Sequence, residues 1–172
     1  MHETIFQTDW GWVGLAATER GVAAVVLPKP TRRAVERALR ESGINGDAAS
    51  NGAGRAARHL EAARAAVAAY LEGNVRDFEL PLDLQGQPRF RVKVWKVLQS
   101  IPYGRVRSYG WVARKVGKPR AARAIGGACG ANPVPPLVPC HRVIAGDGSL
   151  GGFSGGVSVK KRLLRLEGLT PQ

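Results

Sequence analysis

A thiol and an imidazole stand side by side near the end of a proline-rich segment. Residues 132–143 read NPVPPLVPCHRV, so Cys140 follows four prolines and is followed at once by His141 and Arg142. A free cysteine is only a few per cent thiolate at neutral pH, and a nearby base or positive charge makes it a better nucleophile. Adjacent residues of a regular strand point apart, so a contact between Cys140 and His141 requires a turn or a bridging water.

These residues alone leave three interpretations open: an inert buried cysteine beside a surface histidine, a metal site, and a nucleophile. The chain has two cysteines and three histidines and no ligand pair at zinc spacing, which argues against a metal. The other cysteine, Cys129, lies close to this motif, and it either packs near a bound ligand or is a buried helix residue, which is the interpretation we favour. Glu167 is either a surface carboxylate or the third group that orients His141 and stabilises its charge.

The net charge of the chain is unevenly distributed. Residues 1–86 hold 10 Lys and Arg and 11 acids, whereas residues 87–172 hold 16 Lys and Arg and 2 acids, a net charge of +14. A half that is almost free of acids favours a polyanionic partner, most simply a nucleic acid. The alternative is a charge that serves only solubility.

Composition indicates the compartment. Two cysteines in 172 residues provide no disulfide framework, which favours a reducing environment. The first ten residues, MHETIFQTDW, lack the basic start and apolar run of a signal peptide, and no apolar run approaches the ~20 residues of a membrane span. We therefore expect a cytoplasmic protein with no membrane partner.

The first half alternates short strands and helices. Its pattern predicts two strands within residues 10–27, a helix over 31–42 with Thr31 as N-cap, a helix over 55–73 and a strand over 77–84. A boundary is expected at residues 85–89, giving domains 1–86 and 87–172.

The second half is predicted to be all-helical. Residues 90–101 form an amphipathic pattern, Ser108 caps a short helix, and residues 120–131 form a further helix after a Gly-containing turn. This is the layout of a helix-turn-helix. Ser158 is expected to cap a last helix. The fold class is therefore α+β, with an α/β-like N-terminal domain and an all-α C-terminal domain.

With these motifs in place, the sequence resembles the O6-alkylguanine-DNA alkyltransferases. The similarity is dense over residues 88–172 and is one of length and layout over 1–87, where it implies an RNase H-like domain. The residues that carry it are PCHRV (139–143), NPVP (132–135), SY (108–109), RAARAIGGA (120–128), GGFSGG (151–156) and LLRLEG (163–168).

The resemblance implies a reaction and a set of catalytic residues. Cys140 attacks the alkyl carbon on guanine O6 and keeps the alkyl group, after the nucleotide has been flipped out of the duplex. His141 acts as base through a water with Glu167 behind it, Asn132 braces the turn that leads to the active site, and Tyr109 helps rotate the nucleotide and donates a proton to the leaving guanine.

The resemblance also implies binding residues. Val143 and Ser154 bind the flipped base through backbone groups, Pro135, Phe153 and Gly155 line the pocket, and Lys160 lies close by. Arg123 fills the gap in the base stack. The small residues of the same helix allow a close approach to DNA: Ala121, Ala122, Ala124 and Gly126. Proline at 135 and glycine at 155 accompany acceptance of benzyl groups in the family.

The implied partner is double-stranded DNA containing O6-alkylguanine, with O4-alkylthymine as a second lesion, and the implied protein is a monomer that binds DNA cooperatively. No cofactor and no metal are expected: some members bind zinc in the first half, but this chain has no cysteine before Cys129. Phe153 stands where many members have tyrosine, so stacking survives and a hydroxyl contact is lost. Two other classes compete: a basic helix-turn-helix module without chemistry, and a cysteine-dependent hydrolase.

Overall fold

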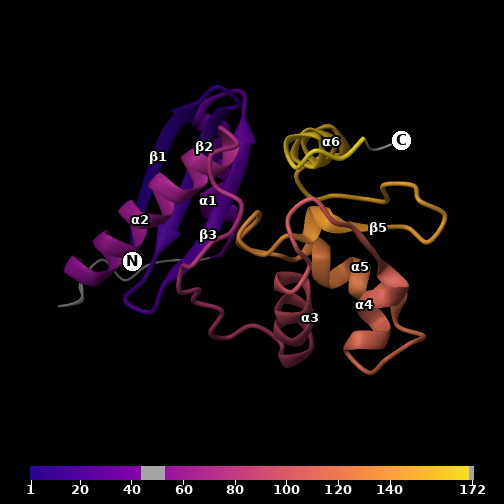
Figure 1. Cartoon of the computed structure of the whole chain (residues 1–172). Coiled ribbons are helices and arrows are strands. Elements are labelled where there is room, and N and C mark those ends of the chain that lie inside the picture. The colour runs from indigo at the N-terminus through magenta and orange to yellow at the C-terminus, as the bar shows by residue number, and fades with distance from the viewer. Residues whose placement is uncertain (44–52, 171–172) are drawn as a thin grey trace. The chain divides into compact units, whose positions relative to one another are not determined.

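A computed structural model describes residues 1–43 and 53–170 of the chain (Figure 1). The chain divides into two compact units. One comprises Met1–Gln85 and Pro133–Pro135, and the other comprises Gly86–Asn132 and Pro136–Gln172. Within the described residues, every helix is too short or too polar to cross a bilayer.

The first unit is built on a three-stranded antiparallel sheet in the order β1-β2-β3. Its strands are β1 (His2–Thr8), β2 (Gly11–Ala17) and β3 (Val22–Lys29). The two strands predicted within residues 10–27 are confirmed as β2 and β3. β1 was not predicted; its burial pattern is mixed, with Phe6 as its one fully buried position.

The strand predicted over residues 77–84 is wrong. That segment makes only an isolated parallel bridge, between Leu82 and Val22. Pro81 has no N–H to give to a ladder, although its carbonyl accepts a hydrogen bond from the Val22 amide at 2.8 Å. Alternation of apolar and polar residues was therefore not enough to make a strand here.

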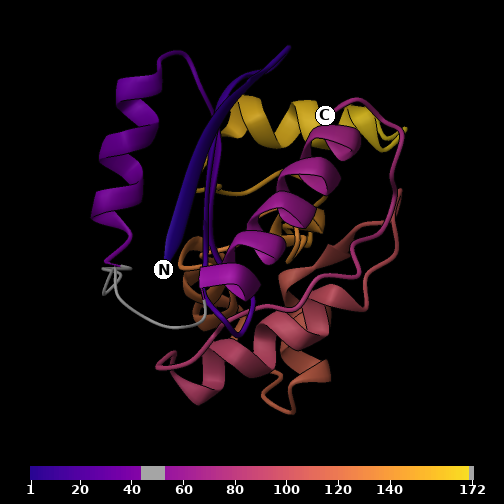
Figure 2. The same ribbon diagram turned by 90° about the vertical axis from the view of Figure 1, so that its left-hand side faces the viewer.

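Two helices cover the two faces of this sheet, as Figure 2 shows with the sheet nearly edge-on. They are α1 (Arg32–Glu41) and α2 (Ala53–Leu71). Thr31 caps α1 as predicted, because its side chain accepts a hydrogen bond from the Ala34 amide at 3.2 Å. Both faces of β2 are consequently buried.

The second unit is helical except for one very short ladder. Its elements are α3 (Arg89–Gln99), β4 (Arg107–Ser108), α4 (Tyr109–Lys115), α5 (Ala122–Gly130), a 3-10 turn (Cys140–Arg142), β5 (Val143–Ile144) and α6 (Val157–Leu166). Ser108 caps α4 through a 3.1 Å hydrogen bond from the Trp111 amide, as expected. Ser158 is not a cap: α6 begins at Val157, after Gly156 at φ 90°.

The parallel ladder of β4 and β5 was not anticipated by an all-α prediction, and it positions the candidate site. Arg107 pairs with Val143 and Ser108 pairs with Ile144. The pairing ties the start of α4 to the segment that follows Cys140. It therefore brings Tyr109, the next residue of the chain, towards the thiol.

The packing of α1 on the sheet yields a test of the first unit. A Cβ at Gly14 would lie 2.4 Å from Cγ1 of Val35 and 3.0 Å from Cδ1 of Leu39, both in the core. We expect Gly14→Ala to lower the free energy of unfolding by about 1–3 kcal/mol, because overpacking forces the neighbouring side chains to shift.

Urea denaturation of the two variants checks this expectation. The matched control is Gly54→Ala on the exposed side of α2, where we expect a gain of about 0.5–1 kcal/mol from helix propensity. Equal effects of the two substitutions would contradict the packing of α1 on β2.

Candidate active site

Cys140 begins a single 3-10 turn directly after Pro139. The turn comprises Cys140–Arg142, and all three residues are buried, with Cys140 at 2% exposure. A contact between Cys140 and His141 was expected to require a turn or a bridging water, and the structure has a turn at this point. The adjacent residues thus leave the strand-like alternation that would point them apart.

Asn132 holds the thiol directly. Its Nδ2 donates to Sγ of Cys140 at 3.1 Å and to the carbonyl of Val138 at 2.7 Å. The amide of Asn132 also donates to the carbonyl of Cys129 at 3.2 Å, so this one residue links the end of α5 to the nucleophile. The bracing role implied for Asn132 fits these contacts, and the bond to sulfur goes beyond it.

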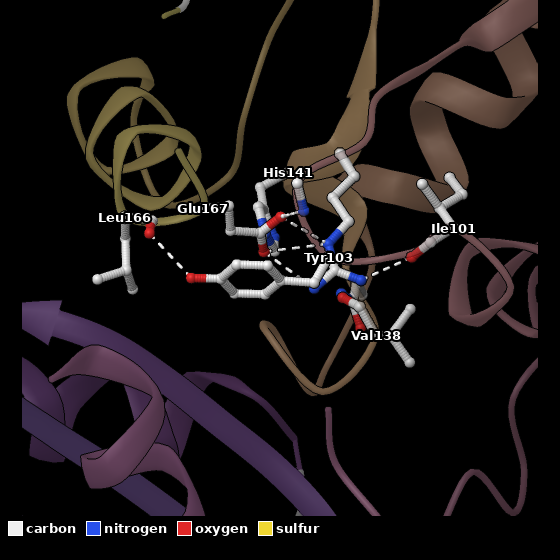
Figure 3. A network of polar contacts seen from close by, with 9 residues as sticks. Ile101, Tyr103, Val138, His141, Leu166 and Glu167 are labelled. Carbon is white, nitrogen blue, oxygen red and sulfur yellow. Dashed lines mark hydrogen bonds and ion pairs between the residues drawn. The ribbon is translucent and has the colours of Figure 1, made fainter. Parts of the chain in front are cut away.

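The carboxylate of Glu167 is the centre of a buried polar network (Figure 3). Its Oε1 lies 2.8 Å from Nε2 of His141, and Gly104 donates its amide to Oε2 at 2.9 Å. Nε of Arg142 lies 3.0 Å from both carboxylate oxygens, and its Nη2 lies 2.9 Å from Oε1. Glu167 is therefore no surface carboxylate: it is 5% exposed and fully engaged.

Arg142 and the turn before β4 are parts of the network that sequence reasoning missed. Nη1 of Arg142 donates to the carbonyl of Ile101 at 2.6 Å, and the hydroxyl of Tyr103 donates to the carbonyl of Leu166 at 2.8 Å (Figure 3). One signal was present in the sequence. The second half has only two acids, so a buried cation there has few carboxylates with which it can pair. Arg142 directly follows the catalytic candidates Cys140 and His141.

Two pKa shifts describe the resting state of the site. Burial raises the pKa of the Cys140 thiol above its ordinary value, and the hydrogen bond from Asn132 and the charge of Lys160 offset this only in part. Burial lowers the pKa of His141 below its ordinary value despite the opposing effect of Glu167. The site therefore rests as a neutral thiol and a neutral imidazole.

The basic surroundings of Cys140 therefore do not by themselves lower the pKa of its thiol below the ordinary value. Arg142 is paired with the carboxylate of Glu167, which offsets its positive charge. The charge of Lys160 lowers the pKa of the Cys140 thiol, but burial raises this pKa by more. Because the Glu167 carboxylate accepts a hydrogen bond from Nε2 of His141, the neutral imidazole of His141 carries its lone pair on Nδ1. A neutral imidazole of this tautomer is a base, and it can take a proton when the thiol reacts.

Lys160 supports the loop after Cys140. Its side chain is fully buried, and Nζ donates to the carbonyl of Val143 at 2.6 Å and to that of Leu150. Burial lowers the pKa of Lys160. Since the Val143 carbonyl already has this partner, the contact of Val143 with a base stays a prediction.

A cavity of about 540 Å³ opens beside the thiol, entirely within the second unit. It brings together seven of the residues predicted for the site: Tyr109, Ala122, Arg123, Gly126, Cys140, Phe153 and Ser154. It also includes Gly130 and Gly152, which were not predicted, and Cys129, for which a buried helix position was favoured over a position near the ligand. The other predicted residues do not line it: Asn132, His141, Glu167, Val143, Lys160, Pro135, Gly155, Ala121 and Ala124.

Tyr109 forms one wall of this cavity at the start of α4. Burial raises the pKa of its hydroxyl to about 12, with charge on Cys129 and Cys140 adding to the shift. A Cβ on Gly151, which has φ 68°, would lie 3.0 Å from the Tyr109 hydroxyl oxygen. The glycine-rich segment thus leaves room for the tyrosine, which remains protonated at neutral pH.

The surface of the second unit is almost purely cationic. Glu167 is buried, so Asp147 is the one acid left on the surface of residues 87–172. Of the 16 basic residues, only Arg142 and Lys160 are buried. Arg123 is exposed near the start of α5, at the cavity. A search of the described residues finds no cluster of three or more His, Cys, Asp or Glu that could hold a metal.

Comparison with known proteins agrees with the geometry. The sequence model for the "6-O-methylguanine DNA methyltransferase, DNA binding domain" matches residues 89–169. A methylated-DNA--protein-cysteine methyltransferase of Mycolicibacterium paratuberculosis is 50% identical over 99 residues, which are 58% of this chain and 59% of that protein. This match therefore spans less than two thirds of that relative's length.

Two further comparisons extend over nearly the whole chain. The crystal structure of Mycobacterium tuberculosis OGT in complex with DNA has a TM-score of 0.76 and 35% identity, covering 97% of this chain and 92% of that one. A methylated-DNA--protein-cysteine methyltransferase of Methanosarcina acetivorans is 36% identical over 168 residues, 98% of this chain and 99% of the relative. With PCHRV folded around a buried thiol, the chain belongs to the methylated-DNA--protein-cysteine methyltransferase family.

Proposed function

We propose that this protein repairs O6-alkylguanine in DNA by transferring the alkyl group, once and irreversibly, to Cys140. One observation carries the proposal: Sγ of Cys140 accepts a hydrogen bond from Asn132 at 3.1 Å beside a cavity of about 540 Å³. That volume lies within the ~300–1,000 Å³ of ordinary small-molecule sites. It supports a pocket for one flipped base.

Flipping is required because the alkyl carbon of a stacked base is out of reach of any thiol. Extrusion costs a few kcal/mol, least for a damaged and poorly paired base. The exposed guanidinium of Arg123 stands at the cavity and takes the place of the extruded base. Phe153, on the glycine-rich segment, offers an aromatic face for stacking.

The reaction is a displacement at carbon. Sulfur of Cys140 bonds to the alkyl carbon as the bond from that carbon to guanine O6 breaks. The thiol proton passes through a bridging water to the neutral imidazole of His141, whose new charge is stabilised by Glu167 at 2.8 Å. Tyr109, protonated at neutral pH, supplies a proton to the leaving guanine. The products are guanine and a thioether, which water does not cleave, so each molecule acts once.

DNA is held by charge rather than by sequence. We assign α4 and α5 to a helix-turn-helix in which α5 approaches the DNA backbone. Ala121, Ala122, Ala124 and Gly126 make this helix slim enough for close contact. The surface cations of the second unit neutralise DNA phosphates. The displacement at carbon changes no oxidation state, so the reaction requires no redox cofactor.

The remaining assignments complete the proposal. The DNA-binding and transfer functions belong to residues 87–172, and the protein acts as a monomer that binds DNA cooperatively. O4-alkylthymine is a second substrate. The two cysteines are both free and buried, which supports action in the reducing cytoplasm.

The first prediction is stoichiometric transfer. Incubation with excess duplex DNA containing O6-methylguanine should add one methyl group per protein molecule, measured as the intact mass, and peptide mapping should place it on Cys140. Cys140→Ser should bind the same DNA and gain no mass. Methyl on Cys129, or repair of several lesions per molecule, would sink the proposal. DNA binding without any transfer would favour the helix-turn-helix module.

The second prediction concerns Arg123. Arg123→Ala should slow repair of duplex DNA more than repair of a single-stranded oligonucleotide, because only the duplex demands that a gap in the stack be filled. Arg165→Ala removes the same charge from α6, away from the cavity, and is the matched control. Each lost phosphate contact should reduce the log–log salt slope of binding by about 0.9. Equal losses on both substrates would remove Arg123 from the flipping step.

The third prediction concerns pH. The lowered pKa of His141 keeps the base neutral through neutral pH, so the single-turnover rate should hold steady there and fall only below pH 6.5, the ordinary imidazole value. His141→Gln should slow transfer by about 10²–10⁴-fold and leave DNA affinity intact.

His59→Gln, on α2 of the first unit, is the matched histidine control and should retain both the rate and its pH profile. An acid limb that persists in the His141 variant would assign the titration to another group.

A further inference from the structure

A short proline segment that leads to Cys140 belongs to the first unit. Pro133–Pro135 are part of that unit, although the chain on both sides of them is part of the second. The amide of Val25 in β3 donates a hydrogen bond to the carbonyl of Pro133 at 2.8 Å. Val134 is fully buried. The chain therefore runs along the three-stranded sheet just before it reaches the nucleophile.

The contact lies on the outer edge of β3, which is an edge strand of the sheet. The outward N–H and C=O groups of an edge strand require partners, and two segments supply them here. The amide of Val22 donates to the carbonyl of Pro81, and the carbonyl of Val22 accepts from the amide of Asp83, both at 2.8 Å. The second partner is Pro133, at Val25. Both valines thus direct their amides away from β2.

A β-bulge at Ala23 makes this arrangement possible. Successive amides of a regular strand point to opposite edges, so those of Val22 and Val25, three positions apart, would normally face opposite ways. Two consecutive residues of β2 pair with Val22 and Ala24, which makes Ala23 the extra residue of the ladder. The extra residue shifts the alternation by one position. The bulge therefore turns the Val25 amide outward, towards Pro133.

The link from Pro133 to Cys140 is short and stiff. Four of its eight residues are prolines, whose φ is fixed near −65°. The other end of the link is held by Asn132, whose Nδ2 donates to the carbonyl of Val138 at 2.7 Å and to Sγ of Cys140 at 3.1 Å. Asn132 is also the direct neighbour of Pro133. A displacement of Pro133 is consequently passed to the thiol.

The strand that holds Pro133 is itself fixed on both faces. Ala24 and Val26 belong to the core cluster that includes Val35 and Leu39 of α1. Val25, whose side chain alternates to the opposite face, is 5% exposed. Because a close-packed interior resists displacement, β3 is a firm support for the segment on its edge.

We propose that the bulge at Ala23 and the outward amide of Val25 position the nucleophile: by holding Pro133, they fix the placement of Cys140 against a bound alkylated base. This inference rests on the proposed alkyl transfer and gives the first unit a part in it. Val25 touches neither the substrate nor the reacting atoms, so it is a positioning residue. Misplacement of a reacting group by 1 Å can slow a reaction by about 10²-fold.

The test removes this one hydrogen bond in the full-length protein. Val25→Pro lacks the amide hydrogen, and proline is tolerated on an edge strand where the N–H faces away from the ladder. Single-turnover methyl transfer is measured at saturating duplex DNA containing O6-methylguanine, together with the affinity for that DNA. We expect the rate to fall at least about tenfold and the affinity to be retained. The same factor should appear with methylated single-stranded DNA, because the defect lies in the placement of the thiol.

Val22→Pro is the matched control. It removes the equivalent hydrogen bond on the same edge of β3, the one to Pro81, which does not lead to the active site. This variant should retain the transfer rate. Thermal melting measures the stability that each variant loses and separates slow transfer from partial unfolding. If Val25→Pro fails to fold, replacement of Val25 by its α-hydroxy acid turns the same amide into an ester and removes only the N–H.

The outcomes separate the two proposals. Slow transfer that is confined to the change at Val25 supports the positioning role. Equal rates in the Val25 and Val22 variants at matched stability overturn it and leave the repair function standing. A loss of rate on duplex DNA alone also overturns it, because the defect would then lie in base flipping. Absence of methyl transfer in the unsubstituted protein overturns the proposed function itself.

Discussion

The buried carboxylate of Glu167 is the constraint around which the second unit is organised. It ends α6, and it gathers His141 and Arg142 from the 3-10 turn and the Gly104 amide from the turn before β4. Burying a charge is costly unless it is paired and hydrogen-bonded, and breaking such a pair costs about 3–5 kcal/mol. Three segments distant in sequence are therefore held together by one side chain.

The same network decides the state of the nucleophile. The charge of Arg142 is offset by its ion pair with Glu167. Burial is therefore the largest effect on the Cys140 thiol, and it raises the pKa of that thiol. A protonated thiol reacts slowly with electrophiles, whereas a neutral imidazole held by Glu167 is ready to accept a proton. The site is thus suited to a thiol that reacts only when a substrate fills the cavity beside it.

Burial also sharpens the electrostatic contrast between the surface and the interior. Glu167 is withdrawn from the surface of the second unit, which leaves Asp147 as its only surface acid against fourteen basic residues outside the core. The polar interior and the cationic exterior are therefore two results of one arrangement. A field of this kind attracts a polyanion from solution without selecting a sequence.

Local sequence signals were sufficient where structure depends on neighbours along the chain. Thr31 and Ser108 cap helices as predicted, and the turn at Glu19–Gly21 separates two strands, because caps and tight turns are made by adjacent residues. The alternating pattern of residues 77–84 predicted a strand, but Pro81 has no N–H to donate and the segment forms only an isolated bridge. Ser158 was predicted to cap the last helix, but that helix begins at Val157 and its N-cap is Gly156.

The sequence by itself determined the chemistry available: one thiol beside an imidazole, a single useful carboxylate in Glu167, and a cationic second half. Only the tertiary structure decided how these are used. It paired Arg142 with Glu167, placed Asn132 on the sulfur, and turned Cys129 into the cavity. These outcomes depend on burial and on contacts between distant residues, which fix pKa values and pocket walls and leave no periodic trace along the chain.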